Sequence, residues 1–151
     1  MLKGIDPLVS PELLRTLAAM GHGDTIAVCD ANFPAESVAR STVTGTLVRL
    51  DGVGIGRAVA AILSLLPLDP FDGPPAHRMM TAGGPDDVPP VHREILDAVH
   101  AAEGPAVEVA ALERFAFYEA ARGAFAVVAT GEQRGYGNVL LRKGVILQDR
   151  D

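Results

Sequence analysis

Two residues near the start of the chain have types and spacing suited to proton chemistry. His22 lies between Gly21 and Gly23, and Asp30 directly follows the apolar segment 25–29. The flanking glycines free the backbone around the imidazole, a group that exchanges protons near neutral pH. In open α/β sheets ligands bind outside the carboxyl ends of the strands, so Asp30 is expected to meet one, with His22 near the same pocket. The alternatives are a turn residue at Asp30 and a solvated imidazole on a helix cap.

Two later groups add hydrogen-bonding capacity. Arg114 and Tyr118 are four residues apart, on one face of an expected helix. Tyr136, Gly137 and Asn138 place a phenol, a small residue and a carboxamide in succession. Guanidinium forks and carboxamides suit hydroxylated ligands. The alternatives are a surface arginine beside a half-buried tyrosine, and a turn that enters a strand. Together with His22 and Asp30, these residues indicate proton transfer on a neutral, hydroxylated ligand.

The elements that must position these residues alternate between strand and helix. A helix is expected to begin at Ser10, its N-cap, with Pro11 in the first turn, and to end at Gly21, which delivers the chain to His22. Strands are expected at 25–29, 46–50, 77–81, 106–110, 125–129 and 139–147, and further helices at 57–66, 91–101 and 113–121. This alternation predicts one α/β domain over residues 1–151 with a mainly parallel central sheet.

Several other patterns have ordinary structural interpretations. Residues 35–44, which include one helical turn, and 68–90 are expected to be largely loop, apart from the strand at 77–81. The glycines of 52–56 match neither a dinucleotide fingerprint nor a P-loop, so they are interpreted as a helix entry. Cys29 is interpreted as a small core residue rather than a nucleophile. His92 and His100 are expected to be solvated on a helix, and no spacing suits a zinc site.

The composition excludes several classes of protein. The chain has 151 residues, of which 48% are hydrophobic, so it is long and apolar enough to bury a core. A net charge of −6 argues against nucleic acid or an anionic membrane as the main partner. No secretory signal is visible, and the apolar run 58–66 is too short to span a bilayer. A single cysteine suits a reducing cytoplasm, so a cytoplasmic protein is expected.

At the residues that could do chemistry the sequence resembles the D-ribose pyranase and L-fucose mutarotase family, and more closely its fucose branch. The resemblance follows the chain in order through residues 1–5 and 8–14, MGHGD at 20–24, DANFPA at 30–35, RFAFYE at 114–119, TGE at 130–132 and YGNVLLRKGV at 136–145. It implies a single-domain, three-layer α/β sandwich. It also implies oligomers, commonly decameric rings, with sites near subunit boundaries. Residues 35–44 and 68–90 match only loosely, which leaves the sugar and the lining of the pocket open.

The resemblance also implies roles for individual residues. His22 would be the catalytic acid/base, and Asp30 would bind the sugar and support the histidine. Arg114 would bind sugar, Tyr118 would lie near the site, and the triplet at Tyr136, Gly137 and Asn138 would close the pocket. No cofactor or metal is expected.

The implied activity is that of an L-fucose mutarotase, which interconverts the α and β anomers of a free monosaccharide by acid/base-catalysed ring opening and reclosure. The alternatives are a ribose pyranase, which interconverts pyranose and furanose rings, and a non-enzymatic monosaccharide-binding or sensing protein.

Overall fold

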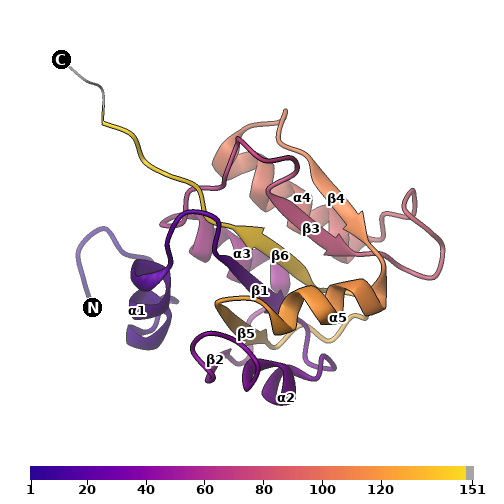
Figure 1. The fold of residues 1–151 in the computed structure, drawn as a ribbon, viewed down its shortest axis with the longest axis horizontal. Helices are drawn as coiled ribbons and strands as arrows, with labels where there is room; N and C mark the ends of the chain where they lie inside the picture. Colours follow the sequence, from indigo (N-terminus) through magenta and orange to yellow (C-terminus); the bar gives the residue numbers. More distant parts are fainter. Residues whose placement is uncertain (149–151) are drawn as a thin grey trace.

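A computed structural model describes residues 1–148 and contains a six-stranded sheet between layers of helices (Figure 1). The strands are β1 (Thr25–Cys29), β2 (Leu47–Leu50), β3 (Ala76–Met79), β4 (Val109–Leu112), β5 (Ala126–Thr130) and β6 (Val139–Arg142). The helices are α1 (Pro11–Ala19), α2 (Ala35–Ala39), α3 (Ile55–Leu63), α4 (Pro90–Glu103) and α5 (Arg114–Arg122). The predicted α/β architecture is confirmed.

The sheet has the order β2-β5-β1-β6-β3-β4. Strand β5 pairs in parallel with β1 and β2, and β3 pairs in parallel with β4. Only β6 runs the other way, between β1 and β3, with Thr25 opposite Arg142 and Val28 opposite Val139. The sheet is therefore mainly parallel, as predicted. Polar residues gather at both ends of its central strands, and β6 runs from one of these ends to the other.

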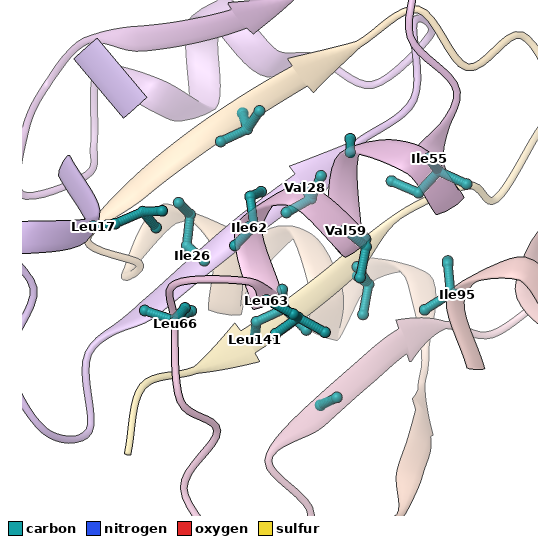
Figure 2. Close-up of a cluster of buried hydrophobic side chains, with 14 of the residues drawn as sticks. Leu17, Ile26, Val28, Ile55, Val59, Ile62, Leu63, Leu66, Ile95 and Leu141 are labelled. Atoms are coloured by element: carbon teal, nitrogen blue, oxygen red, sulfur yellow. The ribbon is translucent and has the colours of Figure 1, made fainter. Parts of the chain in front are cut away.

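The two faces of the sheet bury different side chains. Along β1, Ile26 and Val28 join a core cluster with residues of α1, α3 and α4, whereas Ala27 and Cys29 join a second cluster with residues of α2 and α5. Figure 2 shows the first cluster, where Ile62 of α3 lies among apolar side chains of the sheet. A strand buried on both faces reads as a continuous apolar run rather than an alternating one. Cys29 is accordingly fully buried, as predicted.

Several element boundaries differ from the predicted ones. The Ser10 hydroxyl accepts a hydrogen bond from the Leu13 amide (3.2 Å), which confirms the N-cap, but the C-cap of α1 is Met20 rather than Gly21. The backbone of Met20 is already extended there (ψ 139°), and its amide still donates to the carbonyl of Thr16. Residues 35–39 form a helix, α2. None of the helices within residues 1–148 is long and apolar enough to cross a bilayer.

Two strands near the end of the chain are displaced or shortened. Strand β4 occupies Val109–Leu112 rather than 106–110, because its register is set by pairing with β3. Strand β6 ends at Arg142 rather than at residue 147. Beyond it the amide of Lys143 donates to Asp24 and that of Gly144 to Pro67, so the chain leaves the sheet to join neighbouring loops.

Candidate functional site

Asp30 is the centre of a buried hydrogen-bond cluster at the carboxyl end of β1. Its Oδ1 accepts from the amides of Asn32 (3.0 Å) and Phe33 (2.9 Å). Its Oδ2 accepts from the amide of Gly137 (3.1 Å) and from Nδ2 of Asn138 (3.0 Å). The amide of Asp30 in turn donates to Oδ1 of Asn138 (2.8 Å). The carboxylate therefore joins the turn after β1 to the segment that enters β6.

The burial of Asp30 affects the pKa of its carboxyl and the access of a ligand to its oxygens. The residue is only 3% exposed, and burial raises the pKa of its carboxyl above the ordinary value, although its hydrogen bonds oppose this shift. Four donors of the protein fill the acceptor positions of the two oxygens. In this arrangement Asp30 braces the backbone of the site.

Aromatic rings extend from this cluster to α5. The ring of Tyr118 lies 5.4 Å from that of Phe33, which follows Asp30 in the same turn. The guanidinium carbon of Arg114 lies 5.9 Å from the centre of the Tyr118 ring. Tyr118 and Tyr136 are half-buried, and both pack against the core cluster on the α5 side of the sheet. Arg114, Tyr118, Tyr136, Gly137 and Asn138 therefore belong to the same end of the molecule as Asp30.

A cavity of about 470 Å³ borders the turn that follows β1 at Asp30. It is bordered by the carboxyl ends of β1 and β5, by β2 and by α2; its polar lining includes Asp30, Glu36, Ser37, Arg40, Arg49 and Thr130. Part of the 35–44 segment thus lines a pocket beside Asp30. None of the other predicted sugar-binding residues borders this cavity.

The expected proximity of His22 and Asp30 is wrong within one chain. His22 precedes β1 and Asp30 follows it, so the five residues of this strand separate them. A strand of that length spans about 16 Å. The glycines do form a turn at His22, but this turn lies at the amino end of β1, beside Arg142 rather than Asn138.

His22 has its own buried carboxylate partner. Its Nε2 lies 3.3 Å from Oδ1 of Asp69, and Nε of Arg142 donates to Oδ2 of the same carboxylate (3.0 Å). The imidazole is half-exposed and meets the ring of Phe71 edge-on. The pKa of the Asp69 carboxyl is lowered, chiefly by a hydrogen bond from the amide of Phe71 and further by Arg142 and His22. A buried, ionised carboxylate can therefore orient the exposed imidazole.

Asp69 is a site residue that the sequence did not predict, and the prediction of a solvated His92 is wrong. Asp69 lies in a proline-rich loop, and nothing in its spacing connects it with His22. His92 was expected to be solvated, yet it is fully buried and bonds through Nε2 to the carbonyl of Tyr136 (2.8 Å). The spacing of the helix does indicate this burial, because positions 92, 95 and 99 share a helical face, and Ile95 and Val99 are apolar core residues.

The two ends of β1 carry complementary chemical groups. The Asp30 end offers amide, phenol and guanidinium groups for hydrogen bonds to hydroxyls, and the His22 end offers an imidazole, a side chain that can act as a general acid or base. Within residues 1–148, no three His, Cys, Asp or Glu side chains lie close enough to hold a metal ion. The fold and these residues define an α/β protein that is equipped to bind a polyhydroxy ligand and to move its protons.

The chain belongs to the RbsD / FucU transport protein family, whose family model matches residues 3–146. It is 43% identical over 145 residues to an L-fucose mutarotase from Haemophilus influenzae (strain 86-028NP), an alignment that covers 96% of this chain and 97% of the relative. Its fold is similar to the crystal structure of protein Atu2016 (TM-score 0.94, 49% identity, 97% of each chain). It is also similar to the fucose mutarotase from Streptococcus pneumoniae in complex with L-fucose (TM-score 0.83, 39% identity, 97% of this chain and 100% of the other).

Proposed function

We propose that this protein is an L-fucose mutarotase, an isomerase that interconverts the α and β anomers of L-fucose. The observation that carries this conclusion is its identity of 41–43% to L-fucose mutarotases over 96% of the chain. The solved fucose mutarotase that holds L-fucose shares its fold over nearly the whole chain. The binding and proton-transfer groups described above agree with this activity.

His22 is the group that we expect to move protons. Mutarotation removes a proton from the anomeric hydroxyl and delivers one to the ring oxygen, so that the ring opens, the aldehyde rotates and the ring recloses. Since Nε2 of His22 faces the Asp69 carboxylate, the proton of the neutral imidazole belongs on Nε2. Nδ1 then carries the lone pair that accepts the proton from the anomeric hydroxyl, and the resulting imidazolium returns it to the ring oxygen. The net change in protonation is zero.

The complete site needs a second copy of the chain. His22 and the sugar-binding groups beside Asp30 are separated by the length of β1, which is too far for both to contact one monosaccharide. An oligomer in which the His22 end of one protomer meets the Asp30 end of another brings the two groups together. This arrangement agrees with the predicted homo-oligomer, for which a ring of ten copies is one form.

The activity is tested by exchange NMR of the anomeric protons of L-fucose, D-ribose and D-galactose. Fast α/β exchange on L-fucose that is lost in His22→Ala would support the proposal. Faster pyranose–furanose exchange on ribose would favour the ribose pyranase. Binding of sugar without acceleration of any exchange would move the assignment to a sensing protein.

The shared site is tested by mixing two inactive variants. His22→Ala and Asn138→Ala, each inactive alone, are unfolded together and reassembled in equal amounts. If the two residues act across a boundary between copies, about a quarter of the sites recover both native residues. Recovery of activity near that level supports the shared site, and a mixture that stays inactive contradicts it.

A cytoplasmic location completes the proposal. The single cysteine, Cys29, is a buried thiol, which suits a reducing compartment. Fractionation of cells that express the protein tests this location.

A further inference from the structure

Tyr136 holds an unusual backbone conformation in the proposed sugar site. Its φ is 61°, and among residues 1–148 it is the only residue other than glycine with a positive φ. A tyrosine adopts this left-handed region at a cost in energy, because its Cβ crowds the backbone. The chain places glycine on either side, at Gly135 and Gly137, but not at the strained position itself. Neighbouring contacts must therefore hold Tyr136 in place.

The carbonyl of Tyr136 is fixed by two donors. Nε2 of His92, on the first turn of α4, lies 2.8 Å from this oxygen. The amide of Asn138 donates to the same oxygen, also at 2.8 Å. Because the next amide, that of Gly137, donates to Asp30, the conformation of Tyr136 sets the position of the whole Asp30 cluster.

Arg78 determines which nitrogen of His92 carries the proton. Its Nη1 lies 3.1 Å from Nδ1 of His92, and the guanidinium is held by the carbonyls of Asp87 and Pro85. A guanidinium only donates hydrogen bonds and a carbonyl only accepts them. The proton of His92 must therefore be on Nε2, with the lone pair of Nδ1 facing Arg78. Burial lowers the pKa of His92, which agrees with a neutral ring.

We propose that His92, held by Arg78, is a positioning residue that fixes Tyr136 and Gly137 in the geometry required to bind sugar. His92 is fully buried, so it acts through the backbone of Tyr136 and does not touch the ligand. The inference rests on the proposed function for the identity of the sugar, but the hydrogen bonds that carry it are independent of that identity.

The matched control lies on the same helix. His100 also bonds through Nε2 to a backbone carbonyl, that of Val107 (2.9 Å), but near the other end of α4 and away from Tyr136. If His92 only anchors α4, substitution of either histidine should have similar consequences. If His92 positions the site, only its own variants should alter sugar binding.

Two substitutions at His92 separate the donor from the bulk of the ring. The amide nitrogen of Gln can take the place of Nε2 and donate to Tyr136, whereas the shorter Asn reaches only the place of Nδ1. We expect His92→Asn to raise KM for L-fucose on the order of tenfold, about the effect of one lost hydrogen bond, with a smaller change in kcat. His92→Gln should restore most of the KM. His100→Asn and His100→Gln should leave KM unchanged.

Two NMR measurements keep the test independent of activity. In wild type, the imidazole ¹⁵N shifts of His92 should show a proton on Nε2 and none on Nδ1 at pH 7. The amide of Gly137 should shift in His92→Asn and return towards the wild-type position in His92→Gln. A wild-type His92 with the other tautomer or a charged ring would overturn the proposal, even if His92→Asn does not fold.

The kinetic outcomes are equally decisive. Equal KM values in the His92 and His100 variants would make His92 a structural residue only, and failure of Gln to rescue Asn would exclude the donor role. If wild type accelerates exchange of no sugar, the proposed function fails. The two NMR measurements then still decide whether His92 positions Tyr136.

Discussion

Nε2 of His22 lies 3.3 Å from Oδ1 of Asp69, in a pair that joins a half-exposed imidazole to a nearly buried carboxylate. Arg142 holds the other oxygen of the carboxylate, which limits its rotation. This pair gives the imidazole a preferred orientation before any sugar binds. His22 is thus better prepared for proton transfer than its exposure suggests.

Asp69→Asn should slow anomeric exchange while leaving the protein folded. An asparagine that keeps accepting from Arg142 turns its amide donor towards Nε2 of His22, which favours the wrong tautomer. We expect kcat to fall on the order of tenfold, a part of the 10²–10⁴-fold that a positioned acid or base contributes. Exchange NMR with L-fucose measures it. Asp72→Asn, at an exposed carboxyl of the same loop, is the control, and equal rates in the two variants would contradict the role of Asp69.

Asp30→Asn should weaken both the fold and the binding of sugar. The new amide places N–H groups against the donors of Gly137 and Asn138, so at least one buried hydrogen bond is lost. The free energy of unfolding should fall by about 1–3 kcal/mol, and KM should rise. Urea denaturation and saturation kinetics measure the two effects. Asp51→Asn, at an exposed residue that also borders the cavity, should change stability little; unchanged stability of Asp30→Asn would show that this carboxylate is not a brace.

Glu132 should contribute to stability in a way that acid removes. It accepts hydrogen bonds from Arg134 and from the amide of Ile55 at the start of α3, and the Arg134 contact is the main reason that its pKa falls to about 2. A lowered pKa stabilises the folded state above the ordinary value of 4.5, and this stabilisation is lost as the pH falls towards 2. Glu132→Gln should therefore cost on the order of 2 kcal/mol at pH 7 and much less near pH 2.5.

Urea midpoints at the two pH values, with wild type alongside, test this expectation for Glu132. Glu94→Gln removes a half-exposed partner of the same arginine and should have a smaller effect. A Glu132 variant whose loss of stability is the same at both pH values would show that its charge is not responsible.

His92, which is buried, and His77, which is half-buried, should make the fold more stable at pH 7.5 than at pH 5.5. Burial lowers the pKa of His92 and His77, so the folded state resists protons that the unfolded state accepts below about 6.5. The contribution of these histidines to the free energy of unfolding is therefore fully present above pH 6.5 and is lost as the pH falls below it. The raised pKa of Asp30 acts in the opposite direction at lower pH. Urea midpoints across this range should vary less in His92→Gln than in wild type; an equal slope would mean that His92 does not contribute.

The sequence predicted local features better than relationships across the chain. Strand β1 was predicted with its observed bounds because an apolar segment between polar turns has few alternatives. Asp30 was correctly placed at the carboxyl end of that strand. The separation of His22 from Asp30 was not predicted, because a short interval in sequence does not fix a short distance in space. A strand is the most extended element, so the eight positions from His22 to Asp30 carry the chain along β1 from one end of the strand to the other.

Contacts between segments that are far apart in the sequence were the hardest to predict. The bond from His92 to Tyr136 joins residues 44 positions apart, and that from Asp69 to Arg142 joins residues 73 positions apart. Neither pair has a local signature. Such pairs depend on how α4 and the loop after α3 fold back onto β6, which periodicity and turn chemistry do not specify.

The antiparallel direction of β6 restricts how this chain can diverge. Within four residues β6 runs from Val139, next to Asn138 at one polar cluster, to Arg142 at the other. Gain or loss of one residue here would turn the following side chains to the opposite face of the sheet and misplace one cluster relative to the other. Loops such as 104–108, between α4 and β4, contribute to neither cluster and can lengthen or shorten without this consequence. Insertions and deletions among descendants of this chain should therefore accumulate in its loops and spare β6.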